Sequence, residues 1–132
     1  MAKRKGGRSW SVSLSAFMET VEADLVQKQS DMAMEALRVI VERAPVDTGR
    51  FMANNIVSIG EPVFYSLDAY DQDGHETIAK GYAELAHLVP YSVVYIQNNL
   101  IYAGALEDGH SGQAPAGVYG VAYLSISAKS KA

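Results

Sequence analysis

The sequence contains no cysteine and no apolar run long enough to cross a membrane. Without cysteine there are no disulfides, no thiolate nucleophiles and no zinc site that needs sulfur. A membrane-spanning helix needs about 20 consecutive apolar residues, so we expect no membrane association. The basic N-terminus also lacks the apolar core of a secretion signal. These absences favour a soluble protein made in a reducing cytoplasm.

The first eight residues lack acidic side chains altogether. Lys3, Arg4, Lys5 and Arg8 give this segment a charge of +4, whereas the rest of the chain has 7 basic and 15 acidic residues, or −8. We therefore expect residues 1–12 to form a flexible basic arm. Such an arm can contact DNA or an acidic face of a neighbouring subunit, or remain solvated.

The length of 132 residues, with 48% hydrophobic and 20% charged side chains, is typical of one folded domain. We assign that domain to residues 13–128 and expect residues 129–132 to fray. Apolar residues spaced by three and four predict a long helix from about Ser13 to Ala44, ended by Pro45. It would be roughly 45 Å long, more than this domain can cover. Either part of its apolar stripe faces another subunit, or the helix breaks near Gln29.

Several shorter elements follow. Alternating apolar residues predict strands at 55–59, 63–67 and 92–98, and a second helix at about 76–88 carries Ile78, Tyr82 and Leu85 inward, with Ala86 or Val89. Residues 118–127 alternate like a strand. The predicted fold is α+β: a small antiparallel or mixed sheet packed by a long N-terminal helix and a second, shorter helix.

No enzymatic or metal-binding motif in the sequence has its required residue spacing. Ser111 lies in a Gly-His-Ser-Gly segment whose second glycine comes one residue too early for a nucleophile elbow. The acidic loop at 68–75 lacks the first ligand and the closing glutamate of a calcium loop, so we interpret it as solvated. The three histidines do not pair at metal-ligand spacings. We predict no catalytic residue, no cofactor and no metal.

Two segments carry a resemblance. The first, residues 44–50, reads A-P-V-D-T-G-R; the second, residues 98–117, reads N-N-L-I-Y-A-G-A-L-E-D-G-H-S-G-Q-A-P-A-G. Together with the helix before the first and the helix between them, they resemble the HK97 gp10-like family of tailed-phage neck and tail-completion proteins, which includes minor tail proteins of the lambda Z type. The likeness covers about residues 14–127. Phe51 and Ile101 depart from the family's Leu and Pro, and the family is helical where residues 118–127 alternate.

The resemblance implies a structural protein of the virion, forming a ring at the head-tail junction and assembled in the bacterial cytoplasm. Its partners would be copies of itself, in a hexamer, other neck or tail proteins, and genomic DNA passing non-specifically through the channel. The alternative is a nucleic-acid-associated module that uses the basic arm.

Candidate residues fall into two groups. A structural motif would comprise Pro45, Asp47, Thr48, Gly49, Arg50 and Glu107. Within it Asp47 or Thr48 would accept backbone hydrogen bonds, Gly49 would take a left-handed conformation, and Arg50 would bind the Glu107 carboxylate. The subunit interface would comprise Asn98, Asn99, Tyr102, Gly109, His110, Ser111, Gln113, Ala114 and Pro115.

Overall fold

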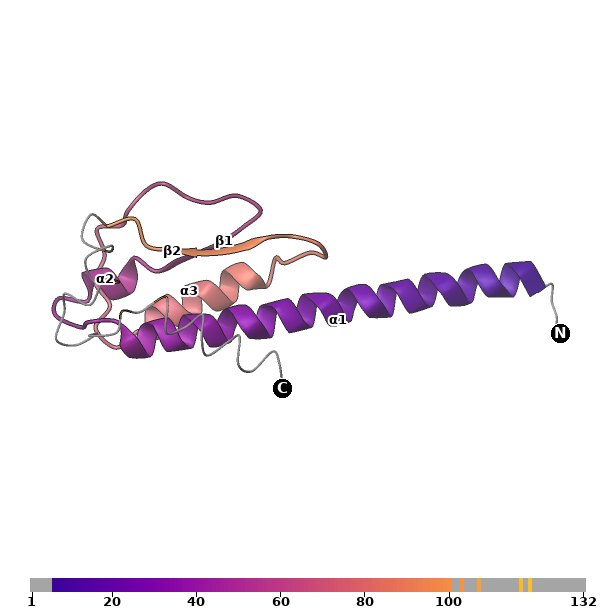
Figure 1. Ribbon diagram of the computed structural model, residues 1–132, viewed down its shortest axis with the longest axis horizontal. Helices are drawn as coiled ribbons and strands as arrows, with labels where there is room; N and C mark the ends of the chain where they lie inside the picture. Colours follow the sequence, from indigo (N-terminus) through magenta and orange to yellow (C-terminus); the bar gives the residue numbers. More distant parts are fainter. Residues whose placement is uncertain (1–5, 101–102, 104–106, 108–116, 118, 120–132) are drawn as a thin grey trace.

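The computed structural model describes residues 6–100 together with Ala103, Glu107, Gly117 and Tyr119, and side chains from Leu14 onward. The element order is α1 (Gly6–Arg43), α2 (Arg50–Ala53), β1 (Ile56–Ile59), α3 (His75–Leu85) and β2 (Val94–Gln97). Strands β1 and β2 form an antiparallel pair in which Val57 lies opposite Ile96. The fold is a small α+β fold, as predicted (Figure 1).

Helix α1 is longer than the sequence indicated. It begins at Gly6, inside the segment expected to be a flexible arm, and its 38 residues continue without a break past Gln29. At 1.5 Å per residue it is about 57 Å long. Its N-terminal half extends well beyond the body formed by α2, α3 and the strands (Figure 1). The break proposed near Gln29 is therefore wrong, and the helix outreaches its own domain.

The core lies at the C-terminal half of α1. Buried apolar residues form two adjoining clusters, and Ile96 of β2 packs against both. One cluster joins α1 to α3 and β1, and the other joins α1 to α2 and Leu100. Their buried members are Ala33, Met34, Leu37, Val57, Leu85 and Leu88 in the first, and Ile40, Ala44, Phe51, Met52 and Leu100 in the second.

The predicted strand at 63–67 is absent; residues 62–71 are irregular. The alternation of Val63, Tyr65 and Leu67 suggested a strand. The backbone of this segment makes its hydrogen bonds to side chains, however, and not to a neighbouring strand. The Gln97 amide bonds both the N–H and the C=O of Val63, at 2.7 and 3.0 Å. Phe64 and Tyr65 in this segment are exposed, whereas Val63 and Leu67 are half-buried.

Helix α3 begins one residue before its predicted start and ends three residues early, at Leu85. Its inner face holds Leu85 and half-buried Ile78, as predicted. Tyr82, Ala86 and Val89 are exposed, contrary to prediction. The helix therefore buries a narrower apolar stripe than its sequence suggested, because only one side of it contacts α1 and β1.

Candidate functional site

The turn at residues 45–50 links α1 to α2 and packs against the segment around Asp71. Gly49 has a φ of 84°, in the left-handed region that glycine adopts readily, as predicted. Its carbonyl accepts hydrogen bonds from the N–H of Ala53 at 3.0 Å and of Asp71 at 2.9 Å. A Cβ added at Gly49 would lie 2.7 Å from the Asp71 backbone. Glycine is thus required here for conformation and for space.

Thr48 accepts a backbone hydrogen bond, as predicted. Its Oγ1 accepts a hydrogen bond from the N–H of Arg50 at 3.3 Å. Asp47 contributes through its backbone instead, because its carbonyl accepts a long bond from the Gln72 amide at 3.4 Å. Pro45 is buried at the end of α1. The turn is therefore a structural connection that fixes where α2 and the 71–74 segment meet.

Asp71 was expected to lie in a solvated loop, but it is buried and holds the start of α3. Its Oδ1 accepts from the N–H of Gly74 at 3.1 Å, and its Oδ2 accepts from the N–H of Thr77 at 2.8 Å. The Thr77 hydroxyl lies 2.7 Å from Asp71 Oδ2 and 3.1 Å from the Met52 carbonyl oxygen. This network ties the first turn of α3 to α2.

These hydrogen bonds control the ionisation of Asp71. Burial by itself raises the pKa of a carboxyl group, but the hydrogen bonds from Thr77 and Gly74 favour the charged form. The net effect is a pKa of Asp71 below its ordinary value. The ionised carboxylate is therefore part of the folded structure.

The predicted pair between Arg50 and Glu107 is not formed. Among the residues that the structure describes, no ion pair joins them, and the Arg50 Nε is buried with no hydrogen-bond partner. Glu107 instead receives the N–H of Tyr119 on Oε1 at 2.7 Å. Gly117 lies against the same glutamate, since an added Cβ would come within 2.9 Å of Oε2. The carboxylate thus binds the backbone that follows Gly117.

Tyr119 and two asparagines form a buried cluster at α2. The Tyr119 hydroxyl donates to Asn55 Oδ1 at 2.7 Å, and the Asn98 amide donates to the same oxygen at 3.3 Å. Asn98 also donates to the Phe51 carbonyl at 3.0 Å. Burial, reinforced by the negative charge of Glu107, raises the pKa of Tyr119, so the phenol stays protonated. The cluster joins Asn98, the first residue of the second resemblance segment, and Tyr119 to α2 and Asn55.

Side-chain amides also hold the irregular 62–71 segment. Asn54, fully buried, accepts the N–H of Leu67 at 2.6 Å and donates to the Leu67 carbonyl at 3.0 Å. Asn99 donates to the carbonyls of Val63 and Tyr65 at 3.1 and 3.0 Å. Because an amide has two N–H donors, those of Asn98 and Asn99 are fully used inside the subunit. A subunit interface that includes Asn98 and Asn99, as predicted, would therefore use atoms of these residues other than their amide N–H groups.

Most of the remaining candidates lie outside the described residues. This applies to Tyr102, Gly109, His110, Ser111, Gln113, Ala114, Pro115, Lys3, Arg4 and Lys5, and to the side chain of Arg8. In the segment 118–127 only Tyr119 is described, and it is helical. Among the described residues, no cluster of histidine and acidic side chains could hold a metal, and no helix is long and apolar enough to cross a membrane.

Two surfaces stand out that the sequence indicated only in part. The projecting half of α1 exposes Leu14, Phe17, Met18 and Leu25, which we call the arm stripe together with half-buried Val21. A groove of about 500 Å³ lies between α1 and α3, lined on α1 by Val26, Met34 and Arg38, and by Tyr82, Leu85 and Leu88. The unusual length of the helix predicted the first surface; nothing in the sequence located the second.

Comparison with models of protein families, with curated proteins and with solved structures gives no significant match.

Proposed function

We propose that this chain is a structural virion protein of a tailed bacteriophage, which forms a ring at the head-tail junction. The observation that carries the proposal is the projecting half of α1. From Gly6 to Leu25 it is about 30 Å long, and its arm stripe is exposed, with Phe17 61% accessible. Contiguous exposed apolar residues mark sites of protein-protein contact. An assembly subunit needs such a surface.

The internal contacts also support an assembly role. The polar side chains of the two resemblance segments bond the subunit's own backbone, as Thr48 does to Arg50 and Asn98 does to Phe51. Such contacts maintain the shape of the subunit. The resemblance to neck and tail-completion proteins supplies the location, with a ring of six copies around the channel through which DNA passes.

The test is to delete the gene from the phage that encodes this chain. We expect filled heads and tails to accumulate unjoined, and cryo-electron microscopy of complete particles to place a ring of this protein at the junction. Supplying the intact protein from a plasmid should restore joined particles. Complete particles that contain no copy of the chain would contradict the proposal.

A second candidate function is a nucleic-acid-associated module. It is favoured by the charge of +4 on residues 1–8 against −8 on the rest of the chain. It predicts salt-dependent binding of the isolated protein to DNA, measured by fluorescence anisotropy, that is lost when residues 1–8 are removed. Equal binding by the truncated protein would exclude it.

A further inference from the structure

The arm stripe has the spacing of one side of a two-helix contact. Leu14, Met18, Val21 and Leu25 follow one another at intervals of four, three and four residues. This is the interval of apolar residues along the contact line between two packed helices. All four residues belong to α1, whose 38 residues form one continuous helix, so the interval is kept along a regular surface.

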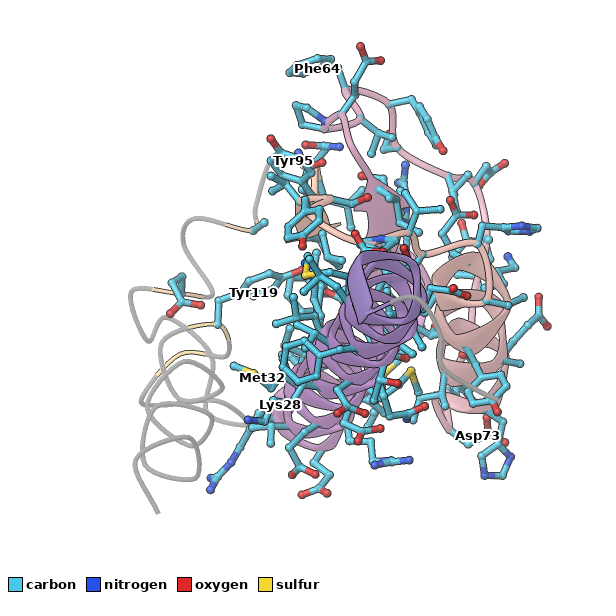
Figure 2. All side chains as sticks on the ribbon, turned by 90° about the vertical axis from the view of Figure 1, so that its right-hand side faces the viewer. Lys28, Met32, Phe64, Asp73, Tyr95 and Tyr119 are labelled. Atoms are coloured by element: carbon cyan, nitrogen blue, oxygen red, sulfur yellow. The ribbon has the colours of Figure 1, made fainter. Side chains whose placement is uncertain are left out.

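The stripe lies on a face of α1 that the rest of the described chain leaves open. Met32 lies 18 residues after Leu14, which is about five helical turns, so both residues are on one face. Figure 2 shows that Lys28 and Met32 point to the side of α1 opposite α3. The half of α1 that carries the stripe also extends past α2, α3 and the strands (Figure 1).

Composition indicates that the projecting half of α1 is stabilised by a partner. Several of its first residues are weak helix formers, namely Gly6, Gly7, Ser9, Ser11, Ser13 and Ser15. Helices in proteins owe most of their stability to the packing of an apolar face, and less to propensity. A second helix packed on the stripe would supply that stability.

We propose that the arm stripes of two copies of this chain pack against each other, with the two α1 helices antiparallel. Placing Leu14 of one copy beside Leu25 of the other also places Met18 beside Val21. The contact is two-fold symmetric, so all four stripe residues of each copy are used. The inference concerns the free chain and goes beyond the proposed ring, because such a pair must open before the stripe contacts another surface.

Lys28 favours the antiparallel direction. It is exposed and continues the line of the stripe three residues after Leu25. Two parallel helices in the same register would place the Lys28 ammonium groups of both copies together on the contact line, where like charges repel. In the antiparallel pair each Lys28 lies beyond the last apolar pair, at opposite ends of the contact.

The acids of the arm favour the proposed register. In this register Glu22 lies beside Ser15 of the other copy, and Asp24 also faces an uncharged side chain. Sliding one helix by about two turns toward the body would place Glu22 beside Glu22 and Asp24 beside Asp24, and like charges at such positions are destabilising. Glu19 lies about 140° around the helix from Leu14, away from the contact line.

The test is disulfide cross-linking of the full-length chain, which has no native cysteine. A protein carrying both Leu14→Cys and Leu25→Cys should form a covalent dimer under a mild oxidant, and the product should stop at the dimer. The two positions are roughly 16 Å apart along α1, too far for a disulfide within one copy. Both are exposed, so the circular dichroism of the reduced variant should match that of the original protein.

Single variants test the direction and the register. Leu14→Cys alone and Leu25→Cys alone should stay monomeric on a denaturing gel, as should the control that pairs Leu14→Cys with the exposed Tyr70→Cys. Absence of a dimer from the double variant would overturn the inference. Dimers of Leu14→Cys alone would show parallel arms, and a ladder of multimers from the double variant would show a head-to-tail contact; either result would also overturn it.

Sedimentation of the unmodified chain gives an independent check. The contact is smaller than a standard interface, so we expect a dimer that forms at high protein concentration and dissociates on dilution. Met18→Glu should weaken it by about ten-fold or more, because the carboxylate would be buried against Val21 of the other copy. Phe64→Glu, 85% exposed and outside the stripe, is the control and should dimerise normally.

The outcomes of this check are separate from those of the proposed function. Equal dimerisation by the Met18→Glu variant, or an original protein that stays monomeric at high concentration, would contradict the arm pair. A ring in phage particles would then still stand. Conversely, a cross-linked dimer of a chain whose deletion leaves complete particles would support the arm pair and remove the ring.

Discussion

The two halves of α1 have similar apolar patterns but opposite surroundings. Around Leu37 and Ile40, which are 0% and 2% exposed, the helix is enclosed by α2, α3 and the strands. Around Leu14 and Phe17 the side chains are 48% and 61% exposed. The same three-and-four spacing therefore builds the subunit core at one end and leaves a free surface at the other. An amphipathic pattern shows that a helix will be covered, but not by which chain.

The largest effect should come from the enclosed half. Leu37→Ala should lower the free energy of unfolding by about 3 kcal/mol or more, because it leaves a cavity against α3 and β1. Urea denaturation followed by circular dichroism measures it. A loss below about 1 kcal/mol would mean that this half of α1 is not the core.

Substitution of Gly49 tests the turn that links the enclosed half of α1 to α2. Gly49→Ala should cost about 3 kcal/mol, because the residue must keep a φ of 84° and its Cβ would meet the Asp71 backbone. Gly60→Ala is the matched control: its φ is 86°, but nothing lies within 4 Å of an added Cβ, so about 1 kcal/mol is expected. Equal losses in urea denaturation would indicate that the close approach to Asp71 contributes nothing.

Asp71, which holds the start of α3, should make the stability of the subunit sensitive to acid. Because the pKa of Asp71 is lowered in the folded state, its ionised form stabilises the protein above its unfolded pKa of about 3.9. That stability is lost as the pH falls through the lower, folded-state pKa. Asp71→Asn should cost about 1–3 kcal/mol at neutral pH and reduce the loss on acidification. Thermal unfolding between neutral and acidic pH measures both; Asp68→Asn, at an exposed position, should behave like the original protein.

Tyr119 should have a smaller effect. Tyr119→Phe removes one donor to Asn55 but leaves that oxygen its bond from Asn98, so we expect a loss of about 1 kcal/mol. The ultraviolet titration of the tyrosines should also lose one group that ionises above the ordinary pKa, since burial raises the pKa of Tyr119. An unchanged titration curve would argue against the buried phenol.

The smallest effect on subunit stability should come from the projecting half. Phe17→Ser should change the free energy of unfolding by less than about 0.5 kcal/mol, because the side chain is exposed. The same variant should abolish joined particles when it replaces the native protein in the phage. Destabilisation comparable to that of Leu37→Ala would remove the contrast between the two halves.

Local sequence determined several features of this protein. The apolar spacing before Pro45 determined the long helix, and the alternation around Val57 and Ile96 determined the two strands that pair. Gly49 and Thr48 determined the turn, since Gly49 permits a left-handed φ and the Thr48 hydroxyl oxygen accepts a hydrogen bond from the N–H of Arg50. Each of these depends on residues close together in the chain.

The tertiary structure decided the rest. Residues 62–71 do not form a strand, because the side-chain amides of Asn54, Gln97 and Asn99 make hydrogen bonds to their backbone. Glu107 accepts the backbone N–H of Tyr119 and does not pair with Arg50. Asp71 became a buried cap because the Gly49 turn packs against it. These hydrogen-bond partners come from distant parts of the chain. Sequence spacing does not indicate which of several possible donors will lie next to a given acceptor in the folded protein.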